Sequence, residues 1–232
     1  MKQEQSVRIQ TSVLNAAEKK VLVWLAQLQP HWMTSDYLTV IGVMGAIVVA
    51  IGYILSNYHI GWLWLASLGY VINWYGDSLD GTLARVRGTQ RPIYGFYLDH
   101  NIDGVTMAVM CIGAGMSSLL NLYIAMGVLA VYLLLSISVY INAHLKGEFK
   151  LTYAGMGPTE FRFIMIVVNA LFFFVVPLRE WNRCFTLVNT TVTLGAFDFI
   201  GIIIWVILIV IYLSNFVRDA EAYAKADPAK PY

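Results

Sequence analysis

Six apolar segments, each close to the length needed to cross a lipid bilayer, constrain this chain more than any other feature. A helix needs roughly 20 apolar residues to span a bilayer core. The segments fall near residues 38–56, 61–83, 99–119, 121–144, 161–179 and 196–217. Because 59% of the residues are hydrophobic and only 12% are charged, a soluble core is excluded. The sequence predicts an all-α integral membrane protein with six transmembrane helices.

An amphipathic helix is expected ahead of the first span, from about Ser6 to Gln29. Its apolar residues recur at helical spacing, interrupted by Glu18, Lys19 and Lys20. The pattern fits a helix on the membrane surface or one packed on the protein. We therefore expect a juxtamembrane helix over 1–37, a six-helix transmembrane domain over 38–218 and a mobile C-terminal tail over 219–232.

Basic residues indicate the orientation in the membrane. If the N-terminus is cytoplasmic, 13 of the 15 Lys and Arg residues face the cytoplasm, and only Arg179 and Arg183 lie outside. Cytoplasmic loops typically carry such an excess. Both termini are therefore expected in the cytoplasm of a multi-pass protein. The net charge of +1 gives no indication of a nucleic-acid partner, and membrane lipids are the expected surroundings.

Four aspartates lie at the cytoplasmic edge of the second and third spans. Asp77 and Asp80 are three residues apart, and Asp99 and Asp103 are four apart, so each pair shares one helix face. A short loop joins the two helices, which allows the four carboxylates to converge. Charges within a membrane are costly, and a hard divalent cation, Mg²⁺ or Mn²⁺, would relieve their repulsion. A cation transporter would instead spread acidic groups through the membrane depth.

A second polar cluster, residues 155–162, follows the fourth span on the same side of the membrane. Thr159, Glu160 and Arg162 are candidates for lining a substrate pocket there. Pro158 and Glu160 are also typical of the first turn of a helix, so the cluster fits a plain helix start as well. We expect His100 to make an interhelical hydrogen bond rather than to bind metal.

The run GDSLDGTLARVRGTQRPIYGFYLDHNIDG resembles the signature of the CDP-alcohol phosphotransferases, also called CDP-alcohol phosphatidyltransferases. That signature reads D-x-x-D-G-x-x-A-R, a spacer, then G-x-x-x-D-x-x-x-D. Its eight fixed positions are filled by Asp77, Asp80, Gly81, Ala84, Arg85, Gly95, Asp99 and Asp103. The spacer has nine residues where the family usually has eight, and the extra residue falls in a loop. The family also has a surface helix followed by six spans.

The resemblance implies roles for these residues. Two divalent ions, Mg²⁺ or Mn²⁺, would be held by Asp77, Asp80, Asp99 and Asp103. Asp103 would also be the general base for the acceptor hydroxyl. Of the possible substrate contacts at residues 155–162, Thr159, Glu160 and Arg162 are the acceptor-binding candidates. The floor of the cytidine-nucleotide site would consist of Asp77, Gly81, Ala84 and Arg85.

An upstream segment resembles the T-P-N element that faces the nucleotide in this family. Thr34 matches it, whereas Ser35 and Asp36 replace the proline and the asparagine. Thr34 and Asp36 are therefore further nucleotide-binding candidates, although an aspartate here also suits a helix cap.

The implied function is a transferase of phospholipid biosynthesis, with residues 38–218 as its catalytic domain. It would move a phosphatidyl or phospho-alcohol group from a CDP-linked donor, with CDP-diacylglycerol favoured, to an alcohol acceptor and release CMP. The sequence Asp99-His100 followed by Asp103 resembles the choline and ethanolamine phosphotransferases, which leaves open a CDP-amino-alcohol donor with diacylglycerol as acceptor. The intact motif argues against an inactive scaffold. Family members are commonly homodimers, which would make a second copy of the chain a partner.

Overall fold

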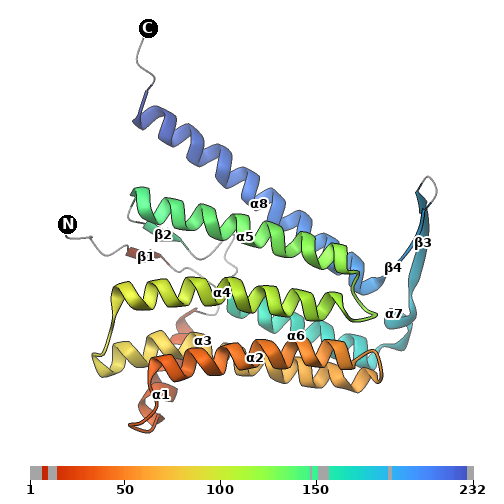
Figure 1. Ribbon diagram of the computed structural model, residues 1–232, viewed down its shortest axis with the longest axis horizontal. Helices are drawn as coiled ribbons and strands as arrows, with labels where there is room; N and C mark the ends of the chain where they lie inside the picture. The colour runs from red at the N-terminus through yellow and green to blue at the C-terminus, as the bar shows by residue number, and fades with distance from the viewer. Residues whose placement is uncertain (1–6, 10–14, 147, 151–156, 188–189, 229–232) are drawn as a thin grey trace.

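Long helices make up most of this computed structural model, which describes residues 7–9, 15–146, 148–150, 157–187 and 190–228. The elements in chain order are β1 (Val7–Ile9), α1 (Asn15–Leu28), α2 (Ser35–Leu55), η1 (Ile60–Trp62), α3 (Leu63–Arg87), α4 (Pro92–Gly115), α5 (Leu122–Lys146), β2 (Glu148–Lys150), α6 (Pro158–Phe174), α7 (Val176–Glu180), β3 (Asn182–Leu187), β4 (Thr190–Gly195) and α8 (Ala196–Ala226). Figure 1 shows α2 to α6 running lengthwise as a bundle, from which α8 diverges.

Helices occupy every segment that the sequence predicts to span the membrane. Among the described residues, three are long and apolar enough to cross a bilayer by length and composition: Ser35–Leu55, Leu122–Leu145 and Ala196–Ala226. α3 and α4 carry the four aspartates, which lower their hydropathy, and α6 has only 17 residues. The mainly helical fold is confirmed, whereas the count of six spans stays a prediction.

Close packing of α2 on α3 sets the frame of the bundle. A Cβ atom added at Gly45 would lie 2.7 Å from the Cα of Asn73, and one at Gly76 would lie 2.6 Å from the Cα of Gly42. Small residues let membrane helices approach this closely. The two backbones therefore touch just before α3 reaches Asp77.

Helix ends follow ordinary capping rules. The Thr34 hydroxyl caps α2 by accepting a hydrogen bond from the backbone N–H of Tyr37 at 3.3 Å. α3 ends at Gly88, whose φ of 64° lies in the left-handed region that glycine adopts without strain. Pro92 then begins α4, where its missing N–H has no helical partner to lose. This short turn brings the two aspartate pairs to neighbouring helices.

The N-terminal segment differs from the expected helix over residues 6–29. The described helix begins at Asn15, whereas Val7–Ile9 pairs in parallel with Glu148–Lys150, and residues 10–14 lie outside the described part. The alternation of Val7, Arg8 and Ile9 has the period of a strand rather than a helix. Leu22 and Ala26 of α1 are buried in a cluster with residues of α3, so this helix packs on the protein. Its contact with the membrane surface stays a prediction.

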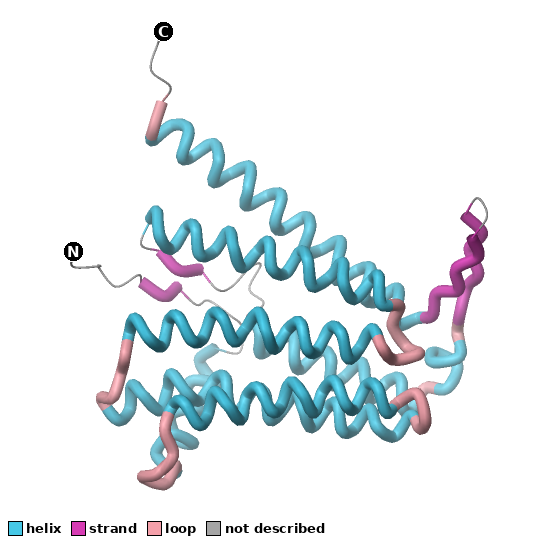
Figure 2. The backbone as a smooth tube through the Cα atoms, viewed as in Figure 1, coloured by secondary structure: helices cyan, strands magenta, loops and turns pink. Residues whose placement is uncertain are grey.

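Two further features depart from the predicted boundaries. α8 continues to Ala226, so the mobile tail expected over 219–232 is helical through its first eight residues. Residues 219–226 are rich in helix-forming Ala, Glu and Lys, and Asp219 and Tyr223 both hydrogen-bond Asn142 of α5. The expected mobility of residues 229–232 lies outside the described part. At the other end of the bundle, the antiparallel hairpin β3–β4 was not predicted (Figure 2).

Candidate active site

Asp80 is fixed by the start of α2. One carboxylate oxygen accepts a hydrogen bond from the Thr39 hydroxyl at 2.7 Å, and the other accepts one from the backbone N–H of Gly81. The Ser35 hydroxyl also donates to the backbone carbonyl of Asp80 at 2.5 Å. These contacts follow from the close approach of α2 and α3. They give Asp80 one orientation at the edge of the aspartate cluster.

Asp77, one turn earlier on α3, is paired with an arginine of α6. The Nη2 atom of Arg162 lies 2.5 Å from Oδ2 of Asp77, and its Nε donates to Oδ1 of Asn73 at 2.8 Å. The Asn73 amide in turn donates to the backbone carbonyl of Gly42 at 2.9 Å. Helix α6 therefore contributes a cation directly to the predicted aspartate site.

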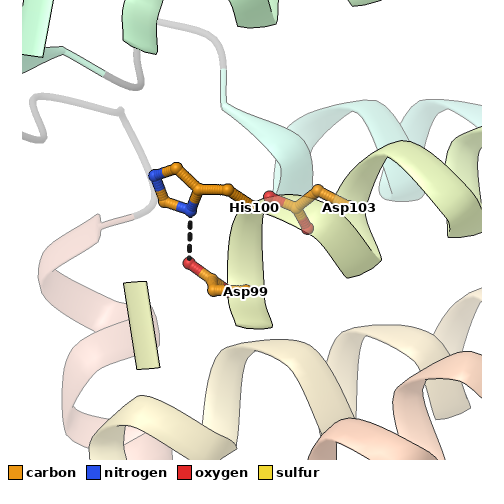
Figure 3. A group of neighbouring side chains, drawn as sticks. All are labelled: Asp99, His100 and Asp103. Carbon is orange, nitrogen blue, oxygen red and sulfur yellow. Dashed lines mark ion pairs between the residues drawn. The ribbon is translucent and has the colours of Figure 1, made fainter. Parts of the chain in front are cut away.

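The second aspartate pair lies on α4, as Figure 3 shows. Asp99, His100 and Asp103 each offer a possible metal-ligand atom, and these atoms lie within 4.8 Å of one another. Nδ1 of His100 is 3.4 Å from Oδ2 of Asp99. The His100 ring also stacks on Tyr140 of α5, with ring centroids 4.8 Å apart. His100 thus contacts α5 by ring stacking, and its backbone carbonyl accepts a hydrogen bond from the Tyr140 hydroxyl at 3.2 Å. The expected interhelical hydrogen bond of its side chain stays a prediction, and the ring also lies close enough to the aspartates to be a ligand.

The two aspartate pairs face one another across α3 and α4. Asp77 and Asp99 line the same small cavity, together with Thr39, Gly42, Asn73, Ile102 and Thr106. Asp103 interacts electrostatically with Asp77, Asp99 and Asp80. This set of carboxylate oxygens is the chemistry that Mg²⁺ and Mn²⁺ prefer, so the residues fit a divalent ion. The tightest group of candidate ligands in the described residues, however, is the one on α4 and leaves out Asp77 and Asp80.

The nucleotide candidates surround the end of α3. A Cβ atom added at Gly81 would meet only the Arg85 guanidinium, at 3.4 Å, so the helix surface there is open. Arg85 donates to the Thr82 hydroxyl at 2.9 Å, and Ala84 is half-buried. These positions leave room for a flat group to lie along the helix.

The upstream candidates lie beside the loop between α3 and α4. Asp36 does not cap α2, because Thr34 does. Instead, both carboxylate oxygens of Asp36 lie 2.5 Å from Nη2 of Arg91. The hydrogen bond to Asp36 raises the pKa of the exposed Arg91 guanidinium above its ordinary value. The ion pair connects the loop, which is one residue longer than usual, to the start of α2.

Arg87 is a positioning residue that the sequence did not indicate. Arg87 donates hydrogen bonds to three backbone carbonyls, those of Met33 at 2.5 Å, Gln29 at 2.8 Å and Pro30 at 2.9 Å. It therefore fixes the turn that precedes Thr34. In the sequence, Arg87 is a second basic residue at a helix end that lies outside the signature, and nothing there indicates its role.

The acceptor candidates at the start of α6 have structural partners. The Thr159 hydroxyl donates to Oε1 of Glu18 at 2.7 Å, and the same oxygen accepts a hydrogen bond from Trp74 at 2.8 Å. Glu160 accepts a hydrogen bond from the backbone N–H of Gly157 at 2.9 Å and so caps α6. Of the three candidates, Arg162 contacts the aspartate cluster, through Asp77. Residues 155 and 156 of this cluster lie outside the described part.

Comparison with known families bears on this site. A family model described as CDP-alcohol phosphatidyltransferase matches residues 32–210, which include all four aspartates. The match confirms the resemblance drawn from the motif. A search among curated proteins found no match.

Proposed function

The chain belongs to the CDP-alcohol phosphatidyltransferase family, and we propose that it moves a phosphatidyl group from CDP-diacylglycerol to an alcohol and releases CMP. Members of this family are membrane-embedded transferases of phospholipid biosynthesis that act on CDP-linked alcohols and generally depend on a divalent metal. The observation that carries the proposal is the convergence of carboxylates from α3 and α4 on one cavity.

In this proposal, two Mg²⁺ or Mn²⁺ ions are held by Asp77, Asp80, Asp99 and Asp103. Bound ions would neutralise the charge that develops on the CMP leaving group. Asp103 accepts the proton of the acceptor hydroxyl while that oxygen bonds to the phosphorus and the bond from phosphorus to the CMP oxygen breaks. A carboxylate at this position must therefore be free of its proton at the start of the step.

The substrates would lie on either side of this cluster. The cytidine nucleotide rests on the surface formed by Gly81, Ala84 and Arg85, with Thr34 and Asp36 at its edge. The alcohol approaches from the start of α6, where Thr159, Glu160 and Arg162 are the candidate contacts. Arg162 is the favoured contact of the three because it reaches Asp77, whereas Thr159 pairs with Glu18 and Glu160 caps α6.

A second reaction of the same class uses a CDP-amino-alcohol donor and diacylglycerol as acceptor. The sequence Asp99-His100 followed by Asp103 is the feature that resembles those enzymes, and in the site His100 lies 3.4 Å from Asp99 and stacks on Tyr140. The two reactions differ in which substrate carries CDP, so a donor screen separates them.

We expect the purified protein to release CMP from a CDP-linked donor only when a divalent metal is present. Four neighbouring carboxylates repel one another without a cation, and the donor's pyrophosphate adds more negative charge. The measurement is CMP release in detergent with CDP-diacylglycerol, CDP-choline or CDP-ethanolamine against a panel of alcohols, with the lipid product identified by mass spectrometry. Turnover that persists after rigorous chelation would contradict the metal dependence. If none of the donors releases CMP, the proposed transferase activity is wrong.

The proposed topology has six spans, α2 to α6 and α8, with both termini and the active site on the cytoplasmic side. Thr89 and Ser118 are exposed residues beyond the two opposite ends of α4, which makes them suitable reporters (Figure 1). The exposed Cys184 is first replaced by serine, whereas the buried Cys111 remains. In intact cells, an impermeant maleimide should label Ser118→Cys and spare Thr89→Cys. Equal labelling of the two would overturn this topology.

A further inference from the structure

Arg162 pairs with Asp77, one of the four carboxylates proposed to bind metal. It reaches from α6 to Asp77 of α3, and the pair is largely enclosed, with side chains 12% and 26% exposed. The distance of 2.5 Å between Nη2 and Oδ2 makes this a direct, charge-assisted contact. One of the two oxygens that Asp77 could offer to an ion is therefore already engaged by a cation of the protein.

The guanidinium is held in place from its other side. Its Nε donates to Asn73, whose side chain is 2% exposed and is itself anchored to the backbone carbonyl of Gly42. These contacts join α6, α3 and α2 around the arginine. Arg162 is therefore a fixed part of the site, because its planar group is oriented by two partners at once.

The negative charges of the surrounding aspartates explain why a cationic side chain is favourable at this position. Arginine keeps its charge at any physiological pH, and Arg162 interacts electrostatically with Asp103 as well as with Asp77. It therefore offsets part of the repulsion among the four carboxylates when they hold no metal. A divalent ion bound to Asp77 would lie close to the guanidinium, and the two positive charges would repel strongly where little water screens them.

We propose that Arg162 is an internal counter-cation that holds Asp77 in the metal-free protein and competes with the divalent ion for that carboxylate. The proposal rests on the metal-dependent function proposed above. Metal loading then releases the guanidinium from Asp77, and only afterwards can it contact an anionic group of a substrate. Arg162 thereby sets the metal affinity of the site and the order in which its ligands bind.

The test measures Mn²⁺ binding to purified protein without substrate, by the electron paramagnetic resonance signal of the free ion. Arg162→Gln removes the charge, so we expect the dissociation constant for Mn²⁺ to fall by about tenfold or more. Arg162→Lys keeps the charge and should bind Mn²⁺ with an affinity between those of the wild type and Arg162→Gln. We also expect Arg162→Gln to melt at a lower temperature than the wild type in EDTA and to gain more from added Mn²⁺.

The matched control is Arg218→Gln, the same substitution at an exposed arginine of α8, which should leave the Mn²⁺ affinity unchanged. If Arg162→Gln does not fold without metal, it can be purified with Mn²⁺ and its affinity measured by competition with a chelator. Unchanged or weaker Mn²⁺ binding in Arg162→Gln overturns the counter-cation and supports a role in acceptor binding alone. Absence of Mn²⁺ binding in the wild type would instead overturn the proposed metal-dependent function itself.

Discussion

Asp103→Asn is expected to lower the rate of CMP release by about 10²–10⁴, the usual cost of losing a general base. Asparagine has nearly the size of aspartate and still offers one oxygen, but it cannot accept the proton of the acceptor hydroxyl. Asp103 lies one helical turn from Asp99 (Figure 3). Because the asparagine oxygen keeps one ligand atom at this position and Asp77, Asp80 and Asp99 keep theirs, the site can still hold metal. Binding of the CDP donor should therefore largely survive while turnover is lost.

The measurement pairs single-turnover CMP release with direct binding of CMP and Mn²⁺ to the variant. Asp227→Asn is the matched control, because Asp227 is exposed at the end of α8, away from the site. Near-normal turnover in Asp103→Asn would show that another group accepts the proton. Loss of metal binding together with turnover would make Asp103 chiefly a ligand rather than the base.

The helices and the aspartate motif could be predicted because their signals are local. Apolar runs of membrane-spanning length form helices whatever surrounds them, and spacings of three and four residues place Asp77 with Asp80 and Asp99 with Asp103. The turn between the pairs is likewise marked by Gly88 and Pro92. These few residues determine which carboxylates meet and so predict a metal site, whereas the nucleotide candidates followed from the resemblance of the motif to a known family.

The partners of those groups could not be predicted, since they come from distant parts of the chain. Arg162 is 85 residues from Asp77, and Thr159 is 141 residues from Glu18. No periodicity connects such pairs; they depend on how α1 and α6 pack on α3. The length of α8 could not be predicted for a related reason. Its last turns are polar, and hydrogen bonds from Asn142 of α5 to Asp219 and from Tyr223 to Asn142 hold them in place.

The pair of Asp36 and Arg91 illustrates the same limit at the proposed nucleotide site. A family motif led to the expectation that Asp36 contacts nucleotide or caps a helix. Instead, the Asp36 carboxylate pairs with an arginine in the lengthened loop, 55 residues away. Asp36 and the extra loop residue are two of the three departures from the family pattern, and Ser35 is the third.

Asp80→Asn is expected to abolish turnover for a different reason, by weakening metal and donor binding together. Both carboxylate oxygens of Asp80 accept hydrogen bonds, one from the Thr39 hydroxyl and one from the Gly81 N–H. In Asp80→Asn an NH₂ group replaces one of these oxygens and would face a hydrogen-bond donor. The Thr39 hydroxyl can rotate to accept from this amide, which keeps the helix packing intact. The cluster nevertheless loses one negative charge and one ligand oxygen.

Loss of partners that merely support a metal ligand typically costs 10–100-fold in metal affinity, and loss of a ligand itself should cost at least about 100-fold. The affinities of Asp80→Asn for Mn²⁺ and, in the presence of metal, for CMP should both fall by at least about 100-fold, the loss expected for a metal ligand. Thr39→Val is the comparison variant, because it removes only the supporting hydroxyl and leaves the carboxylate, so its loss of affinity should be smaller. Normal Mn²⁺ and donor binding in Asp80→Asn would show that Asp80 is not a metal ligand. In that case, the tighter group of Asp99, His100 and Asp103 on α4 would be the better candidate for the ion.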